Sequence, residues 1–378
     1  MSERKRLSLS RLVLFSALPA LVLVAAIELS FRALELARPR LASIPLPEET
    51  FGIVEPDPDL FWRLKPDMVL DYGGEKGGCR TNALGLRSGP LGPKQAGEFR
   101  ILALGESTTF GVGVPDRLAY PQRLESLLHE SGVCPRCRVI NAGVSAWSSF
   151  QSRRYLETRG LALQPDLVLV YHEINDYMPA SFRNAGQSEA AMLRSDLQLH
   201  ASLQQSLGRR LLASSALVRW VAYHRARREV AALRESPRFV DPAAIGLPEI
   251  GLRPLVVRTA DARRAPVNES ALPTRVPPGE RRRMLEEMLR LCRDRGIAFV
   301  VLHPSYRATV PHSCVLTEFC RERGVPMLEA QPLLHPEGVP VEEMFLDKMH
   351  PTARGHEALA RALLELLTSR EMLRRAPS

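Results

Sequence analysis

Residues 100–111 read RILALGESTTFG, an apolar run that ends in a turn rich in small residues. The four apolar residues 101–104 predict a short strand that is buried on both faces. Directly after this strand, Gly105 and Ser107 place a serine on a sharp turn, the exposed position that a nucleophilic hydroxyl group requires. Taken alone, the same turn is also typical of a helix cap, because Ser and Gly are common there.

The pattern of strand and turn recurs along the chain and alternates with amphipathic helices. Further buried strands are predicted at residues 138–140, 166–170, 298–302 and 325–328. Helical spacing of apolar residues is found at residues 120–130, 150–160, 280–295 and 353–367. This alternation predicts an α/β fold, in which a parallel five-stranded sheet carries helices on both faces and the site lies beyond the carboxyl ends of the strands.

Three further segments place polar groups at this edge of the predicted sheet. After the second strand, Gly143 allows a close approach of its N–H to a bound oxyanion, although a tight turn explains the same glycine. After the third strand, Asn175 offers an amide donor, although Asn also starts turns. Before the last helix, Asp347 precedes His350 by three residues, a spacing that orients an imidazole toward a serine or forms a simple surface contact.

Together these segments resemble the motifs of the SGNH hydrolases, also called the GDSL esterase/lipase superfamily. The resemblance covers roughly residues 98–370 and implies the three-layer, flavodoxin-like fold of that family. It implies that Ser107 is the nucleophile, that His350 is the general base and that Asp347 orients His350. Because serine acyl chemistry needs no metal or other cofactor, none is expected.

The resemblance also implies an oxyanion hole, formed by the N–H groups of Ser107 and Gly143 and by the side chain of Asn175. The chain departs from the family pattern at two positions. Glu106 stands in place of Asp in the Gly-Asp-Ser motif, and Glu173 stands in place of Gly in the Gly-x-Asn-Asp motif. The second departure is expected to alter the loop around Asn175 and the access of substrate to it.

Three titratable residues follow the third and fourth strands and are candidates for binding substrate: His172, Glu173 and His303. For His303, a loop histidine that bonds to other protein groups is the alternative. His356 lies inside the last predicted helix, where we expect it at the surface.

Two regions lie outside the minimal catalytic pattern. Residues 32–97 are broken by prolines and are expected to form a linker and a small accessory region, and residues 371–378 form a tail. Residues 178–278 are an insertion between the third and fourth strands, within which residues 199–235 have helical apolar spacing. A helical addition packed on the sheet, a lid over the site and a surface that faces a membrane all fit this spacing.

The N-terminus carries a basic cluster ahead of an apolar run that begins at Leu12. Continued to Phe31, the run predicts a transmembrane signal anchor at residues 12–31. Residues 1–11 would then be cytoplasmic, and the catalytic region would lie outside the cytoplasm, in the periplasm of a Gram-negative cell. A cleaved signal peptide and a buried soluble helix are the alternatives.

Composition excludes several classes of protein. The chain has 378 residues, of which 45% are hydrophobic and 25% charged, as in folded globular proteins. The net charge of +9 suggests nucleic-acid binding as one possible function. The arginines are scattered and no recognition motif accompanies them, so no nucleic-acid partner is expected.

Cys134 and Cys137 predict a loop disulfide or two structural thiols, because no second close pair completes a metal site.

The sequence therefore predicts a membrane-anchored serine esterase that removes acyl groups, acetyl among them, from an extracytoplasmic carbohydrate or lipid through an acyl-enzyme. An O-acyltransferase that modifies an extracellular polysaccharide uses the same serine chemistry and remains open. A catalytically inactive binding domain is the third reading, against which the intact set of Ser107, Asp347 and His350 argues.

Overall fold

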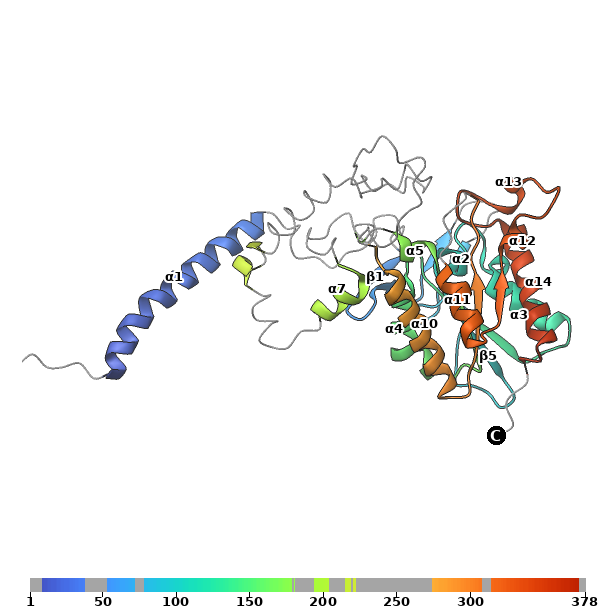
Figure 1. Cartoon of the computed structure of the whole chain (residues 1–378), viewed down its shortest axis with the longest axis horizontal. Coiled ribbons are helices and arrows are strands. Elements are labelled where there is room, and N and C mark those ends of the chain that lie inside the picture. Colours follow the sequence, from blue (N-terminus) through green and yellow to red (C-terminus); the bar gives the residue numbers. More distant parts are fainter. Residues whose placement is uncertain are drawn as a thin grey trace, which may run out of the picture.

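A parallel sheet of five strands forms the centre of the protein (Figure 1). The computed structural model describes residues 9–37, 53–71, 78–178, 180, 194–203, 215–218, 220–221, 274–307 and 314–373. The strands are β5 (Phe99–Gly105), β6 (Cys137–Gly143), β7 (Leu167–Tyr171), β8 (Ala298–His303) and β9 (Met327–Glu329). They are ordered β6-β5-β7-β8-β9 with every pair parallel, which confirms the predicted sheet.

Helices cover both faces of this sheet because its strands are apolar on both sides. Along β5, Leu102 and Leu104 point into one core, whereas Ile101 and Ala103 point into the other, as the period of two in a strand requires. The first core is closed by α4 (Ser149–Thr158), α10 (Pro278–Arg293) and α11 (Cys314–Arg323). The second is closed by α3 (Tyr120–Glu130), α12 (Gln331–Leu334), α13 (Val341–Met344) and α14 (Ala353–Ser369).

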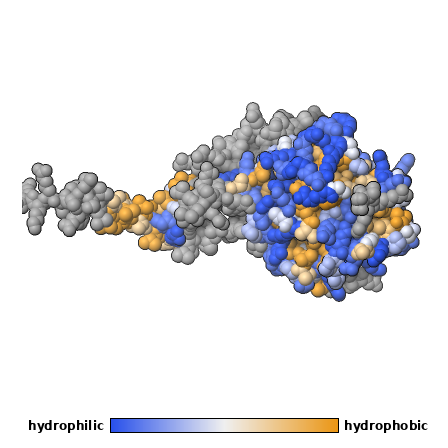
Figure 2. Space-filling model, turned by 90° about the horizontal axis from the view of Figure 1, so that it is seen from below, coloured by the Kyte–Doolittle hydropathy of each residue, from blue (hydrophilic) through white to orange (hydrophobic). Residues whose placement is uncertain are grey.

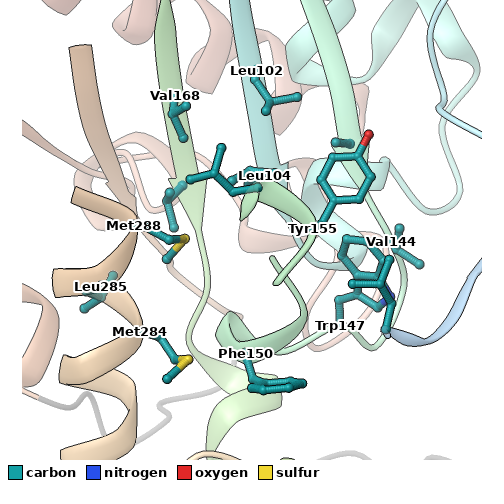
Figure 3. Close-up of a cluster of buried hydrophobic side chains, with 14 of the residues drawn as sticks. Leu102, Leu104, Val144, Trp147, Phe150, Tyr155, Val168, Met284, Leu285 and Met288 are labelled. Carbon is teal, nitrogen blue, oxygen red and sulfur yellow. The ribbon is translucent and has the colours of Figure 1, made fainter. Parts of the chain in front are cut away.

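Figure 3 shows the first core, in which Met284 and Met288 project from α10 toward the strands, and Leu285 of the same helix is buried in this cluster. These three side chains lie at spacings of one, three and four residues, so they share one face of the helix. The predicted amphipathic pattern of α10 is therefore confirmed by the face that it buries. The result is a three-layer α/β fold.

The strand order fixes where a site can form. The chain passes from β5 to β6 on one side of β5 and then returns across β5 to β7. Such a reversal leaves a crevice beyond the carboxyl ends of the strands that flank it. Ser107, which follows β5, and Asn175, which follows β7, both lie at this switch point.

The region before β5 is built into the main core. It forms two antiparallel hairpins, β1 (Val54–Asp57) with β2 (Phe61–Leu64) and β3 (Val69–Asp71) with β4 (Gly78–Arg80). Trp62 is fully buried in the same core as β5. The Nε1–H of Trp147 donates to the Trp62 carbonyl at 3.0 Å, and the Nε1–H of Trp62 donates to the Ser145 carbonyl at 3.3 Å. The accessory region thus packs against the loop that follows β6.

Two segments of the predicted insertion are described in part. Helix α7 (Asp196–Leu203) packs on α4, with His200 against Phe150 at a centroid distance of 5.3 Å. Of the helix predicted over residues 199–235, only 199–203, 215–218 and 220–221 lie within the described residues. The proposed lid and membrane-facing surface therefore stay predictions.

The first helix, α1 (Leu9–Ala37), extends away from the sheet (Figure 1) and exposes apolar side chains such as Leu21 and Leu23. Figure 2 shows hydrophobic surface on the part of the molecule that projects from the main body. Among the helices that the structure describes, none combines the length and the apolarity needed to cross a membrane. The transmembrane segment predicted at residues 12–31 therefore has no support from the structure.

The structure decides between the loop disulfide and the two structural thiols that the sequence allowed at Cys134 and Cys137. Cys134 and Cys137 form a disulfide in the loop before β6, which confirms the loop disulfide. Cys292 and Cys320 are buried free thiols.

Candidate active site

Ser107, His350 and Asp347 lie in one hydrogen-bonded row. The Nε2 atom of His350 is 2.9 Å from the Ser107 hydroxyl oxygen, and its Nδ1 atom is 2.7 Å from the Asp347 Oδ2 atom. The serine and the histidine are 243 positions apart in the chain and meet only because β5 and the loop before α14 end at the same edge of the sheet. The geometry is that of a nucleophile, a base and an orienting carboxylate.

The loop that carries the histidine also fixes the carboxylate. The second oxygen of Asp347, Oδ1, accepts the backbone N–H groups of Met349 at 2.7 Å and His350 at 2.8 Å. Although partial burial alone would raise it, hydrogen bonds from the His350 ring and from these two N–H groups lower the pKa of Asp347 to about 2. Asp347 is therefore ionised at neutral pH and can stabilise a positively charged imidazole.

A tight turn places Ser107 at the first residue of α2 (Ser107–Phe110). Gly105 makes this turn possible, because a Cβ atom there would lie 2.0 Å from the Thr109 hydroxyl oxygen. The helix ends at Gly111, whose φ of 89° is in the left-handed region that favours glycine. The serine is thus held on a short helix between two glycines.

The structure contradicts the predicted role of Gly143. Its N–H donates to the side-chain oxygen of Asn141 at 2.9 Å, so it is already used within β6. A Cβ atom on Gly143 would lie 2.3 Å from the Phe110 backbone nitrogen. The glycine is therefore required because α2 packs directly on β6, and not because its N–H faces the site.

A different residue of the same loop has an unusual backbone. Ala146 has a φ of 62°, which residues other than glycine rarely adopt. The carbonyl of Ala146 accepts the Nη1–H of Arg275 at 2.6 Å, and the preceding Ser145 carbonyl accepts the Trp62 ring N–H. All peptide bonds of the described residues are trans, so the Ala146 N–H points away from Trp62. No sequence signal marks this position, because alanine usually avoids a positive φ.

Asn175, in α5 (Ile174–Tyr177), is held by the residue beside the serine. Its side-chain N–H donates to the Glu106 Oε2 atom at 2.9 Å. Glu106 is 1% exposed, and its burial, together with the nearby Asp176 carboxylate, raises its pKa from the usual 4.5 to about 8. Glu106 is therefore mainly protonated, and uncharged, at neutral pH.

This shift gives the stability of the protein a defined pH dependence. Below pH 4.5 the Glu106 carboxyl is protonated in both states, whereas between pH 4.5 and 8 only the folded protein keeps the proton. The folded wild type therefore loses stability as the pH rises through this window, whereas glutamine cannot titrate. The free energy of unfolding of Glu106→Gln minus that of the wild type should increase by about 1.4 kcal/mol for each pH unit. Urea unfolding of both proteins at pH 5.5 and 7.5 measures the difference, and a difference independent of pH would contradict the shift.

Three residues predicted to bind substrate instead bond to protein groups. His172 is 2% exposed with its Nε2 atom 2.6 Å from the Ser152 hydroxyl oxygen, and burial lowers its pKa to about 3. Glu173 is fully buried. His303 lies between two carboxylates, 3.8 Å from Glu173 and 2.5 Å from Glu329, which raise its pKa to about 9 against the effect of burial. The structure therefore gives no support to direct substrate contact by these residues, because side chains from neighbouring elements surround all three.

Three fully buried arginines hold the loops that follow β5, β6 and β7. None of them is predicted by the sequence, because single arginines in an arginine-rich chain carry no signal. Their bonds are from Arg87 to the carbonyls of Phe110, Gly111 and Val114, from Arg275 to the carbonyl of Ala146, and from Arg281 to the carboxylate of Asp176. Arg87 comes from the accessory region and Arg275 from the end of the insertion, so both regions support the site.

Within the described ranges, no group of three or more His, Cys, Asp or Glu side chains is arranged to hold a metal ion. A three-layer α/β sheet with a Ser-His-Asp row at its carboxyl edge is the architecture of the SGNH class of ester hydrolases. The model of the GDSL-like lipase/acylhydrolase family matches residues 103–358, and the chain belongs to this family. It is an enzyme that acts on ester bonds.

Several solved structures are similar over most of the chain. Axe2, an acetylxylan esterase from Geobacillus stearothermophilus, is 14% identical, with 74% of this chain and 97% of that chain covered and a TM-score of 0.41. A GDSL-like lipase from Bacteroides thetaiotaomicron is 11% identical, with 74% and 93% covered and a TM-score of 0.38. A two-domain esterase active on acetylated mannans is 14% identical, with 74% and 52% covered and a TM-score of 0.37. No curated protein matches.

Proposed function

We propose that this enzyme is a serine esterase that works through an acyl-enzyme. The observation that carries the proposal is the row in which His350 lies 2.9 Å from the Ser107 hydroxyl and 2.7 Å from Asp347. Ser107 attacks the ester carbonyl while His350 takes its proton, and Asp347 stabilises the charged imidazole. His350 then gives the proton to the leaving alcohol, and water releases the acyl group from Ser107 by the reverse sequence.

For the oxyanion we propose three donors, the N–H groups of Ser107 and Ala146 and the side chain of Asn175. Ala146 replaces Gly143, because the Gly143 N–H is bonded to Asn141 whereas the Ala146 N–H is turned away from Trp62. Preorganised donors of this kind stabilise the charge that develops in the transition state.

Asn175→Ala should lower kcat by about a hundredfold or more, because one oxyanion donor contributes about 3 to 4 kcal/mol to lowering the barrier. The measurement is steady-state hydrolysis of a p-nitrophenyl ester. Gln95→Ala, which removes an exposed amide at the opposite end of β5, is the matched control and should leave kcat unchanged. Normal turnover by folded Asn175→Ala would remove Asn175 from the site.

As substrate we propose an acyl ester of a carbohydrate or a lipid outside the cytoplasm. Acetylated xylan and acetylated mannan are convenient first substrates, and release of free acetate is the readout. If the acyl group instead appears on an added sugar acceptor, the enzyme is an acyltransferase that uses the same serine.

The location outside the cytoplasm is part of this proposal, and the Cys134–Cys137 disulfide supports it because such bonds persist in oxidising compartments. A reporter phosphatase that matures only outside the cytoplasm, fused after Ser378, should be active. The variant Leu21→Arg/Val24→Arg, which charges the apolar run, should abolish that activity. An inactive reporter on the intact chain would contradict export, and separation of membranes from soluble exported protein tests the anchor.

A further inference from the structure

The carboxyl group of Glu106 lies directly behind the amide of Asn175. Its Oε2 atom accepts the Asn175 side-chain N–H at 2.9 Å and lies 3.4 Å from the Asn175 backbone nitrogen. Both residues are buried, with Glu106 at 1% and Asn175 at 5% exposure. A primary amide has two N–H donors, so the bond to Glu106 uses one and leaves the second for another acceptor.

Glu106 is itself held by a residue from a distant part of the chain. The hydroxyl of Tyr306, in the loop after β8, donates to the other carboxyl oxygen of Glu106 at 3.1 Å. The same hydroxyl accepts the backbone N–H of Ile174 at 3.0 Å. Tyr306 is 3% exposed and therefore ties Glu106 to the start of α5, the helix that carries Asn175.

The charges around Glu106 favour its neutral form. Two further buried carboxyl groups, Asp176 and Glu173, lie near it, as do the hydroxyl groups of Tyr120 and Tyr171. The cations nearby pair with those carboxyls, Arg281 with Asp176 and His303 with Glu173. An uncharged acceptor orients Asn175 without placing a negative charge beside a developing oxyanion.

We propose that Glu106 and Tyr306 are positioning residues that fix the Asn175 amide, with one N–H on Glu106 and the other directed at the oxyanion. This inference rests on the proposed function and deepens it. It makes Glu106 an uncharged hydrogen-bond acceptor, and it gives the loop after β8 a role in the reaction.

Substitutions at Glu106 test the acceptor. Glu106→Leu removes it, so kcat should fall by about 10- to 100-fold with KM changed by less than about threefold, because only the transition state uses the oriented amide. Glu106→Gln keeps an uncharged side chain of nearly the same shape, with an oxygen that can accept the Asn175 N–H, and should restore kcat to within about fivefold of the wild type. Equal losses in the two variants would overturn the inference.

Tyr306→Phe removes a single hydroxyl group and should lower kcat by about 5- to 20-fold with KM little changed. Tyr155→Phe is the matched control, since Tyr155 is another buried tyrosine, of α4, whose hydroxyl points away from Trp147 (Figure 3). If Tyr306→Phe retains full kcat, Tyr306 has no positioning role. Because this change preserves the ring, it keeps the test available should Glu106→Leu fail to fold.

A double-mutant cycle separates positioning from a general structural effect. In an Asn175→Ala background there is no amide to orient, so Glu106→Leu and Tyr306→Phe should each change kcat by less than about twofold. Losses as large as those in the wild-type background would overturn the inference. If Asn175→Ala alone leaves kcat unchanged, the inference fails while the role of Ser107 stands, since labelling of Ser107 by a serine-directed probe is independent of Asn175.

Discussion

Ser107→Ala is expected to lower kcat on an acyl ester by about 10⁴-fold or more while the protein stays folded. The change removes one oxygen atom, which lies 2.9 Å from His350, and leaves the backbone of α2 in place. Hydrolysis of a p-nitrophenyl ester by the two proteins gives the ratio. Ser126→Ala, which removes a hydroxyl bonded within α3, is the control and should retain wild-type kcat. Comparable turnover by folded Ser107→Ala would exclude Ser107 as the nucleophile.

Arg87→Met should lower the free energy of unfolding by about 3 to 5 kcal/mol. The guanidinium group is fully buried, bonds to the carbonyl of Phe110 at the end of α2 and to those of Gly111 and Val114 beyond it, and pairs with Asp116 at 2.7 Å. Methionine fills a similar volume but removes all of these guanidinium hydrogen bonds, and the loss of buried hydrogen bonds to a charged group is costly.

Urea unfolding of Arg87→Met measures this loss. Arg283→Met is its control, because Arg283 is 62% exposed and its surface pair with Glu287 should contribute less than about 1 kcal/mol. Equal losses in the two variants would show that Arg87 does not stabilise the loop after the serine.

The sheet could be predicted because its signal is local. Runs such as 101–104 and 167–170 are apolar on both faces, and short runs of this kind are typical of strands buried in a parallel sheet. The helices followed from apolar spacing, as in α3, whose predicted bounds of 120–130 agree with the structure. The hairpins before β5 could not be predicted, since their core residues, Trp62 among them, are held by contacts with distant segments.

The site could be predicted in part. The spacing of Asp347 and His350 and the turn at Ser107 are local patterns, and the structure brings all three together. The roles of Gly143 and Ala146 could not be separated, because they depend on which N–H is already bonded and on a backbone angle that alanine rarely adopts.

The burial of single polar residues also could not be predicted from the sequence. His356 was expected at the surface, but it is fully buried, and its Nδ1 atom accepts the Tyr120 backbone N–H at 3.2 Å. An isolated histidine in an amphipathic helix gives no sign of such a partner. Tyr306 and the three buried arginines escaped prediction for the same reason, since each acts through carbonyl, carboxyl or N–H groups that are remote in the chain.

The central claim is that His350 activates Ser107 for attack on acyl esters. The most direct test is to treat the folded full-length chain with a fluorophosphonate and to locate the adduct by peptide mass. The account predicts a single adduct on Ser107, which is lost in Ser107→Ala and strongly slowed in His350→Ala. No adduct on the folded chain, or an adduct on another serine that Ser107→Ala leaves intact, would contradict it.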